Sequence, residues 1–158
     1  MNLRSSTPEE TREIAAALAS TVRPGDVVVL SGDLGAGKTT FVQGLARALG
    51  VEERVTSPSF VLVHEYRGAM RIQHVDVYRL NTLQELFDLG YEELFAPDAL
   101  AVIEWGDAVA GALPPDRLEI SITSDDRDAR QVALRGLGAW RARLDDASLS
   151  LTRWNAAS

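Results

Sequence analysis

The sequence has no cysteine and few histidines, and each shortage excludes a class of protein. The absence of cysteine among the 158 residues excludes a disulfide framework, a thiolate zinc site and a cysteine nucleophile. His64 and His74 are the two histidines, so we expect no multi-histidine metal site. No apolar run reaches the roughly 18 residues of a membrane span, and residues 1–6 lack the apolar core of a signal peptide. We therefore expect a soluble, cytoplasmic protein.

Positive charge is scarce as well. The formal net charge is −7, and Lys38 is the only lysine among 16 basic residues. Because neutralising nucleic-acid phosphates requires a basic face, this balance argues against autonomous binding to nucleic acid.

The length fits one domain over residues 1–158, which can bury a core without disulfide or metal support.

The spacing of apolar and turn residues predicts alternating helices and strands. Thr7, Pro8 and Glu10 form a helix start with a capping box, and that helix is expected to run to about Ser20. A second helix is expected from about Lys38 to the residue before Gly50. Strands are predicted at 27–30, 60–66, 71–77, 100–103, 118–123 and 131–135. A further helix is predicted at 83–94, interrupted near Gly90, and a weak helix with a fraying tail from about 140.

The strongest functional motif is the glycine-rich segment 32–39, GDLGAGKT, which matches G-x-x-x-x-G-K-[ST] in full. Its glycines allow backbone N–H groups to turn inward around an anion, and the following helix presents its N-terminus to phosphates. Lys38, expected to be an exposed loop lysine, reaches the β- and γ-phosphates, and the Thr39 hydroxyl binds Mg²⁺. The motif therefore predicts ATP and Mg²⁺ as ligands; a glycine-rich turn with a solvated lysine is the structural alternative.

A P-loop protein places a second carboxylate at the end of a neighbouring apolar strand. Glu104 ends the strand predicted at 100–103, and Asp76 competes for the role, although alternation could turn it toward solvent. Trp105 suits base stacking or a core position equally. His74 has the pattern of a packed strand histidine. Segment 56–60 lies where P-loop switches sense the γ-phosphate, or it is a plain Ser/Pro turn.

Missing motifs narrow the P-loop subclass. Guanine specificity through Asn-Lys-x-Asp needs a second lysine, so adenine is the expected base. The signature Leu-Ser-Gly-Gly-Gln of ABC ATPases is absent. The two alternatives to an ATPase are a small-molecule kinase, for which 127–130 is a weak lid candidate, and a nucleotide-binding interaction module without useful hydrolysis.

Four motifs together resemble the TsaE (YjeE) family, bacterial ATPases of tRNA threonylcarbamoyladenosine biosynthesis. They are 32–40, 57–60 (SPSF), 74–80 (HVDVYRL) and 103–105 (IEW), and their order and spacing match across residues 7–135. The resemblance implies a three-layer P-loop NTPase-like α/β fold with a mixed, partly antiparallel sheet between helices. It implies TsaD and TsaB as partners, an ATPase that is slow alone and supports turnover of their threonylcarbamoyl transfer, and no sequence-specific tRNA binding by this chain.

The resemblance also implies residue roles. Lys38 holds phosphates, Thr39 and Glu104 hold Mg²⁺, Asp76 lies on the γ-phosphate side, and 57–60 is switch-like, with Ser59 where many relatives have threonine. Either Asp76 or Glu104 positions the attacking water. The implied catalytic residues are Lys38, Asp76 and Glu104. The implied nucleotide contacts are Asp33, Leu34, Gly35, Ala36, Gly37, Lys38, Thr39, Thr40, Asp76 and Trp105. Weaker candidates for contact with the nucleotide are Thr7, Glu10 and Arg130.

Overall fold

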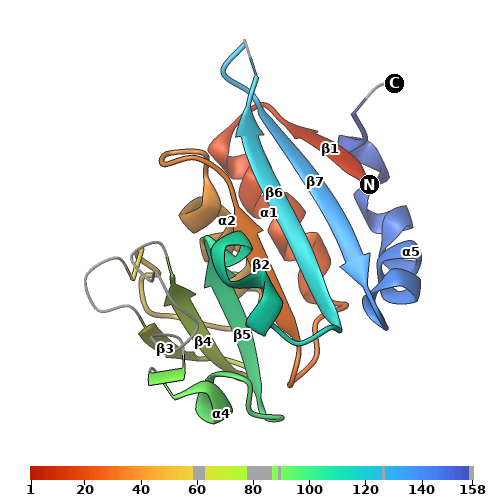
Figure 1. Ribbon diagram of the computed structural model, residues 1–158. Helices are drawn as coiled ribbons and strands as arrows, with labels where there is room; N and C mark the ends of the chain where they lie inside the picture. The colour runs from red at the N-terminus through yellow and green to blue at the C-terminus, as the bar shows by residue number, and fades with distance from the viewer. Residues whose placement is uncertain (59–62, 78–86, 89, 126, 157–158) are drawn as a thin grey trace.

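A seven-stranded mixed sheet organises the chain in the computed structural model, which describes residues 1–58, 63–77, 87–88, 90–125 and 127–156 (Figure 1). The strand order is β1-β7-β6-β2-β5-β4-β3. Strands β6, β2, β5 and β4 are parallel to one another, whereas β1–β7, β7–β6 and β4–β3 are antiparallel pairs. The strands are β1 (Asn2–Ser5), β2 (Val27–Ser31), β3 (Val63–Arg67), β4 (Arg71–Asp76), β5 (Ala99–Glu104), β6 (Arg117–Ser124) and β7 (Arg130–Leu137).

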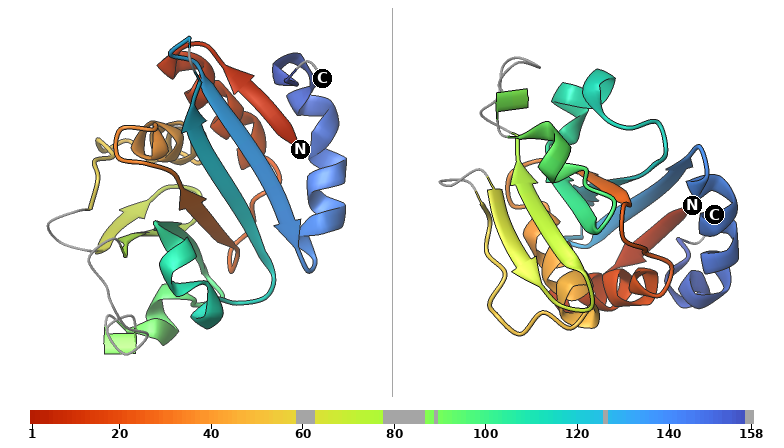
Figure 2. Two further views of the ribbon diagram at one scale, coloured as in Figure 1. Left: turned by 45° about the horizontal axis from the view of Figure 1, so that its top comes forward. Right: turned by 90° about the horizontal axis from the view of Figure 1, so that it is seen from below.

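Helices cover both faces of this sheet (Figure 2). On one face lie α1 (Pro8–Ala19), α2 (Lys38–Ala48) and α5 (Trp140–Leu151); on the other lie α4 (Tyr91–Leu94) and the 3-10 helix η1 (Gly106–Ala112). In β2, Val28 and Leu30 belong to the first core, and Val27 and Val29 to the second. A strand buried on both faces explains the uninterrupted apolar run. The three-layer α/β architecture is therefore confirmed.

Helices α1 and α2 pack closely against each other. Thr7 caps α1, because its Oγ1 accepts the Glu10 N–H at 3.1 Å. The Glu10 carboxylate accepts the Ser6 N–H at 2.6 Å, one residue earlier than a capping box requires. A Cβ at Gly44 would lie 2.4 Å from the Arg12 carbonyl oxygen, so glycine permits the approach of the two helices.

The C-terminal region differs from the weak helix and fraying tail expected from the sequence. Helix α5 packs on the sheet through Trp140, which is only 1% exposed, and through buried Leu151. The 3-10 helix η2 (Thr152–Trp154) follows, and the Ala156 N–H donates to the Asn2 carbonyl oxygen at 3.0 Å. The end of the chain is thus tied to β1, because tertiary packing compensates for weak helical patterning.

One strand was not foreseen from the sequence, and two predicted segments lie partly outside the described residues. Strand β1 lies in a polar N-terminal sequence and forms by pairing with β7. The predicted interruption of the 83–94 helix near Gly90 is confirmed, because Gly90 has a φ of 89° and α4 begins after it; residues 83–86 and 89 lie outside the described residues. The predicted hairpin is confirmed from residue 63 onward, and its residues 60–62 also lie outside them.

Candidate nucleotide-binding site

The glycine-rich loop connects the end of β2 to the first residue of α2. Gly35 and Gly37 have φ values of 80° and 109°, which favour glycine, and a Cβ at either position would project into open space. Gly37 is the N-cap of α2, and no side chain within the described residues caps it. The N-terminal N–H groups of α2 therefore face an open, glycine-lined concavity, which is a favourable place for an anion.

Lys38 folds back over this loop. Its Nζ donates to the carbonyl oxygens of Gly32 at 2.7 Å and Asp33 at 3.0 Å, and lies 3.8 Å from the centroid of the Trp105 ring. With these contacts the side chain is only 6% exposed. The expectation of an exposed loop lysine is therefore wrong, because two carbonyls and an aromatic face replace water around the ammonium group.

The two candidate carboxylates lie side by side. Strands β4 and β5 are parallel, and their register pairs Asp76 with Glu104 at the ends of both strands. Both residues are buried, which excludes the solvent-facing position considered for Asp76. The Thr39 hydroxyl donates to Oε1 of Glu104 at 3.2 Å. A hydroxyl and a carboxylate brought together in this way are oxygen donors that suit Mg²⁺.

Trp105 follows Glu104 in a strained backbone conformation. Its φ of 66° is in the left-handed region, and its N–H donates to the Leu30 carbonyl oxygen at 2.7 Å. The half-buried ring borders a cavity of about 340 Å³ at the loop. Ten residues line this cavity: Leu34, Gly35, Gly37, Lys38, Thr39, Thr40, Ser57, Asp76, Glu104 and Trp105. Of the predicted contacts, Asp33 and Ala36 are not in this lining.

A second cavity, of about 190 Å³, adjoins the other side of the loop. Arg130 reaches it from β7, and its Nε donates to the Ala36 carbonyl oxygen at 2.8 Å. The structure thus brings Thr7 and Arg130 to the loop, while Glu10 is used in capping α1. The lining consists of Ser5, Ser6, Thr7, Pro8, Thr11, Gly35, Gly37, Thr40, Asp128 and Arg130.

Sequence reasoning missed several residues near these cavities. Ser5 and Thr11 share a buried hydrogen bond of 2.7 Å between their hydroxyls, beside the second cavity. No local pattern marks them, because Ser5 belongs to the unforeseen strand β1. Of the switch-like segment, Ser57 lines the larger cavity, whereas Ser59 and Phe60 lie outside the described residues, as do 78–80 of the HVDVYRL motif.

The sheet, the glycine-rich loop at the N-terminus of α2 and the acidic end of β5 define the protein as one of the P-loop fold class. The chain belongs to the TsaE family: the family model "Threonylcarbamoyl adenosine biosynthesis protein TsaE" matches residues 5–132.

Individual relatives agree with this assignment. The chain is 41% identical over 136 residues to the "tRNA threonylcarbamoyladenosine biosynthesis protein TsaE" of Bacillus subtilis, covering 85% of each chain. It is 42% identical over 122 residues to the protein of the same name from Treponema pallidum, covering 77% of this chain and 90% of that one. The crystal structure of Bacillus subtilis YdiB superposes with a TM-score of 0.82 and 35% identity over 94% of both chains.

Proposed function

We propose that this protein is a magnesium-dependent ATP hydrolase that acts as an accessory subunit in tRNA threonylcarbamoyladenosine modification. The observation that carries the proposal is the meeting of Lys38, Thr39, Asp76 and Glu104 at the mouth of the glycine-rich loop. The family assignment supports the pathway, since the relatives are proteins of tRNA threonylcarbamoyladenosine biosynthesis. The proposed location is the cytoplasm. Among the described residues, no helix has the length and apolar character needed to cross a bilayer.

Each residue has a defined task in this proposal. The loop N–H groups and Lys38 bind the phosphates, with the ammonium group exchanging the Gly32 and Asp33 carbonyls for phosphate oxygens. Thr39 and Glu104 hold Mg²⁺, which supplies neutralisation of the phosphate charge when bound. Asp76 or Glu104 orients the attacking water. Because this chemistry consists of positioning and charge stabilisation, partners that complete the site should raise the rate.

The second cavity is the proposed position of the adenosine part of the nucleotide. It adjoins Gly35 and Gly37 on the side away from Glu104, and it offers the Thr7, Thr11 and Arg130 side chains. Arg130 already donates to the Ala36 carbonyl oxygen, so its guanidinium is held at the loop before a ligand arrives. Such preorganisation lowers the entropy cost of binding.

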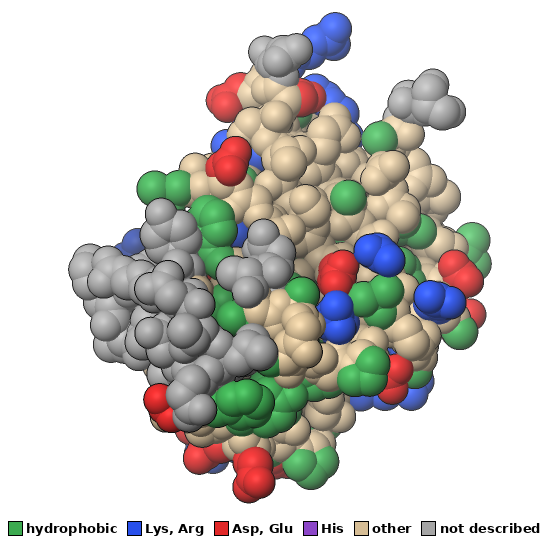
Figure 3. Space-filling model, viewed as in Figure 1, with side chains coloured by type: hydrophobic (Ala, Val, Ile, Leu, Met, Phe, Trp, Pro, Cys, Tyr) green, Lys and Arg blue, Asp and Glu red, His purple; other side chains and the backbone are tan. Residues whose placement is uncertain are grey.

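TsaD and TsaB are the proposed partners, and tRNA recognition is assigned to them. The chain carries a net charge of −7. On the face shown in Figure 3, basic side chains are scattered among acidic ones rather than gathered in a patch. Because tight binding to a phosphate backbone needs clustered positive charge, we expect no sequence-specific tRNA affinity for the isolated protein at physiological salt. Sub-micromolar binding in a salt titration would contradict this expectation.

The test is ATP binding and hydrolysis by the wild type, Lys38→Met and Glu104→Gln, with and without TsaB and TsaD. Lys38→Met keeps the aliphatic stem and should weaken ATP binding about 10–100-fold, since charge-assisted hydrogen bonds are lost. Glu104→Gln should lose affinity mainly when Mg²⁺ is present. Arg135→Met on β7, which removes a cation from a 73% exposed side chain, is the matched control and should bind normally.

The alternatives give different results in the same assay. A small-molecule kinase would transfer phosphate to an added acceptor and ignore TsaB and TsaD. An interaction module would bind ATP without hydrolysing it, and Asp76→Ala or Glu104→Ala would leave its biological activity intact. Unchanged ATP affinity in Lys38→Met would refute the P-loop interpretation itself.

A further inference from the structure

A buried histidine lies next to the proposed metal site and has no role in the function described so far. His74 on β4 is 0% exposed, and its Nε2 lies 3.5 Å from Oε2 of Glu104. Neither ring nitrogen has a hydrogen-bond partner in the part of the chain that the structure describes. Burying an imidazole in this way costs free energy, so its place calls for a compensating interaction.

The register of the sheet explains why His74 faces Glu104. His74 precedes Asp76 by two residues on β4, and Asp76 is paired with Glu104 on β5. Side chains two residues apart on a strand point to the same face, so His74 is a diagonal neighbour of Glu104 on the face that carries α2. The Glu104 carboxylate therefore has two different neighbours: Thr39 at Oε1 and His74 at Oε2.

Tyr66 on β3 supports the histidine from the opposite side. The ring centroids of Tyr66 and His74 are 6.2 Å apart, with an angle of 38° between the planes. The Tyr66 hydroxyl accepts the Thr56 N–H at 3.3 Å and lies 3.1 Å from Nδ1 of His64. The imidazole of His74 therefore lies between Tyr66, which hydrogen bonds hold in place, and Glu104, and this restricts its rotation.

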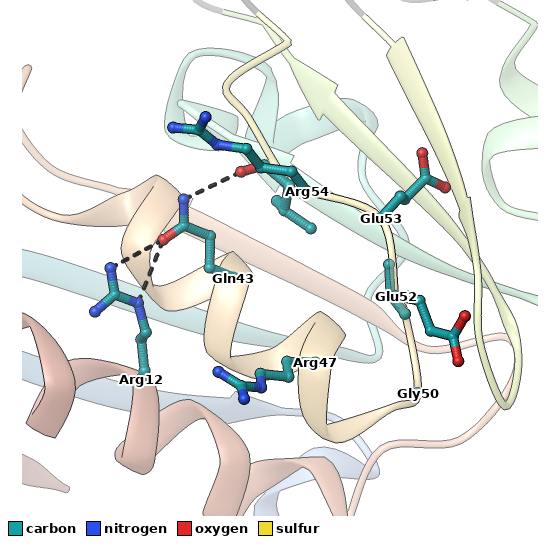
Figure 4. A pocket seen from close by; sticks show the side chains of 9 residues that line it. Arg12, Gln43, Arg47, Gly50, Glu52, Glu53 and Arg54 are labelled. Carbon is teal, nitrogen blue, oxygen red and sulfur yellow. Dashed lines mark hydrogen bonds between the residues drawn. The ribbon is translucent and has the colours of Figure 1, made fainter.

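The residue before Thr56 is hydrogen-bonded to α2, the helix that follows the glycine-rich loop. Figure 4 shows Gln43 on α2 between Arg12 and the segment that carries Arg54. Its Nε2 donates to the Val55 carbonyl oxygen at 3.1 Å, and its Oε1 accepts from Arg12. Because the next residue, Thr56, donates its N–H to the Tyr66 hydroxyl, Tyr66 is linked through this segment to α2.

We propose that His74 is a positioning residue that holds the Glu104 carboxylate in the orientation needed for Mg²⁺. The inference rests on the magnesium–nucleotide function proposed above. Nε2 is a few tenths of an ångström beyond hydrogen-bond distance, so a small shift on metal binding is enough for it to donate to Oε2. Glu104 then presents Oε1, now beside the Thr39 hydroxyl, to the metal. Outer contacts of this kind fix the orientation of a metal ligand.

Three substitutions at His74 test this role. His74→Gln places an amide N–H near the position of Nε2, His74→Asn places it near Nδ1, and His74→Leu supplies no donor. The readout is the affinity for a fluorescent ATP analogue, measured in a Mg²⁺ titration and again in EDTA. Leu and Asn should weaken the Mg²⁺ dependence about tenfold or more and leave the affinity in EDTA unchanged, whereas Gln should recover most of the loss.

A Glu104→Gln background separates positioning from general damage to the fold. If His74 acts through Glu104, a second substitution of His74 there should cause no further loss of Mg²⁺ dependence. The comparison of Gln with Asn keeps the test informative even if the leucine variant does not fold, because both are amides. Equal behaviour of Gln and Asn, equal losses with and without Mg²⁺, or an undiminished effect in the Glu104→Gln background would each overturn the proposal.

The same titration distinguishes the two proposals. A wild-type protein that binds the nucleotide equally well in Mg²⁺ and EDTA would refute the magnesium-dependent function, and this inference with it. A wild-type protein with clear Mg²⁺ dependence that all three His74 variants retain would refute only the role of His74.

Discussion

The contact of α1 with α2 at Gly44 predicts that a single added methyl group destabilises the protein. The Cβ of Gly44→Ala would lie 2.4 Å from the Arg12 carbonyl oxygen and 2.5 Å from its Cα. That is about 1 Å closer than the roughly 3.3–3.6 Å of an ordinary C···O contact. Both neighbours are backbone atoms, so no side-chain rotation relieves the overlap and the two helices must separate.

Two opposing effects set the magnitude. Overpacking of a tight contact costs about 1–3 kcal/mol, while alanine in a helix is favoured over glycine by about 1 kcal/mol. We expect a net loss of up to about 2 kcal/mol in the free energy of unfolding. With a urea m-value of about 2 kcal/mol/M, the unfolding midpoint should fall by up to about 1 M.

The assay is urea unfolding followed by circular dichroism, with Gly111→Ala as the matched control. Gly111 is in η1, and a Cβ there would meet nothing within 4 Å. The control should be neutral or stabilise by about 0.4–1 kcal/mol. If Gly44→Ala raises the midpoint as the control does, helix propensity outweighs the α1–α2 contact and the packing argument is refuted.

Two further predictions concern Asp125, between β6 and β7, and Trp140, the first residue of α5. The pKa of Asp125 is held below its usual value by the backbone N–H groups of Arg127 and Ala129 and by the guanidinium of Arg4. A carboxylate whose pKa is lower in the folded than in the unfolded state stabilises the fold at pH values above the ordinary aspartate pKa. This stabilisation is lost as the pH falls through the folded-state pKa. Asp125→Asn should therefore be less stable than the wild type at pH 7 in urea unfolding, with the difference shrinking below about pH 4; a difference independent of pH would exclude this role. Trp140→Ala should lower the free energy of unfolding by about 3–5 kcal/mol in the same assay, because the ring is buried. A loss below about 1 kcal/mol would instead support the expectation of a fraying C-terminal tail.

The local sequence was sufficient to predict the elements whose residues carry their own signal. The run 27–30, the capping residues Thr7 and Glu10, and the glycine-rich segment before Lys38 each specify structure over a few residues. A turn, cap or buried strand of this kind depends on neighbouring residues, so composition and spacing are enough. The motif order also supported the family resemblance that the comparisons confirm.

Other elements depend on partners far away in the chain. Strand β1 exists because β7 pairs with it, and α5 is stable because Trp140 and Leu151 meet a core that its own weak pattern does not reveal. Neither depends on a local signal, since β1 pairs with a strand more than a hundred positions away and α5 packs on β7 and on the distant helix α1. Prediction from spacing therefore missed the first and undervalued the second.

The sequence by itself determined which residues could bind phosphate and metal, because glycine, lysine, threonine and carboxylate chemistry is a property of residue type. Only the tertiary structure decided which of them meet. The parallel register of β4 and β5 places Asp76 beside Glu104 and brings His74 to the second oxygen of Glu104. The packing of α2 beside the end of β5 brings Lys38 against Trp105. Register depends on how the apolar pattern of each strand matches that of its neighbour, so the pattern within one strand does not show which residues of two strands are paired.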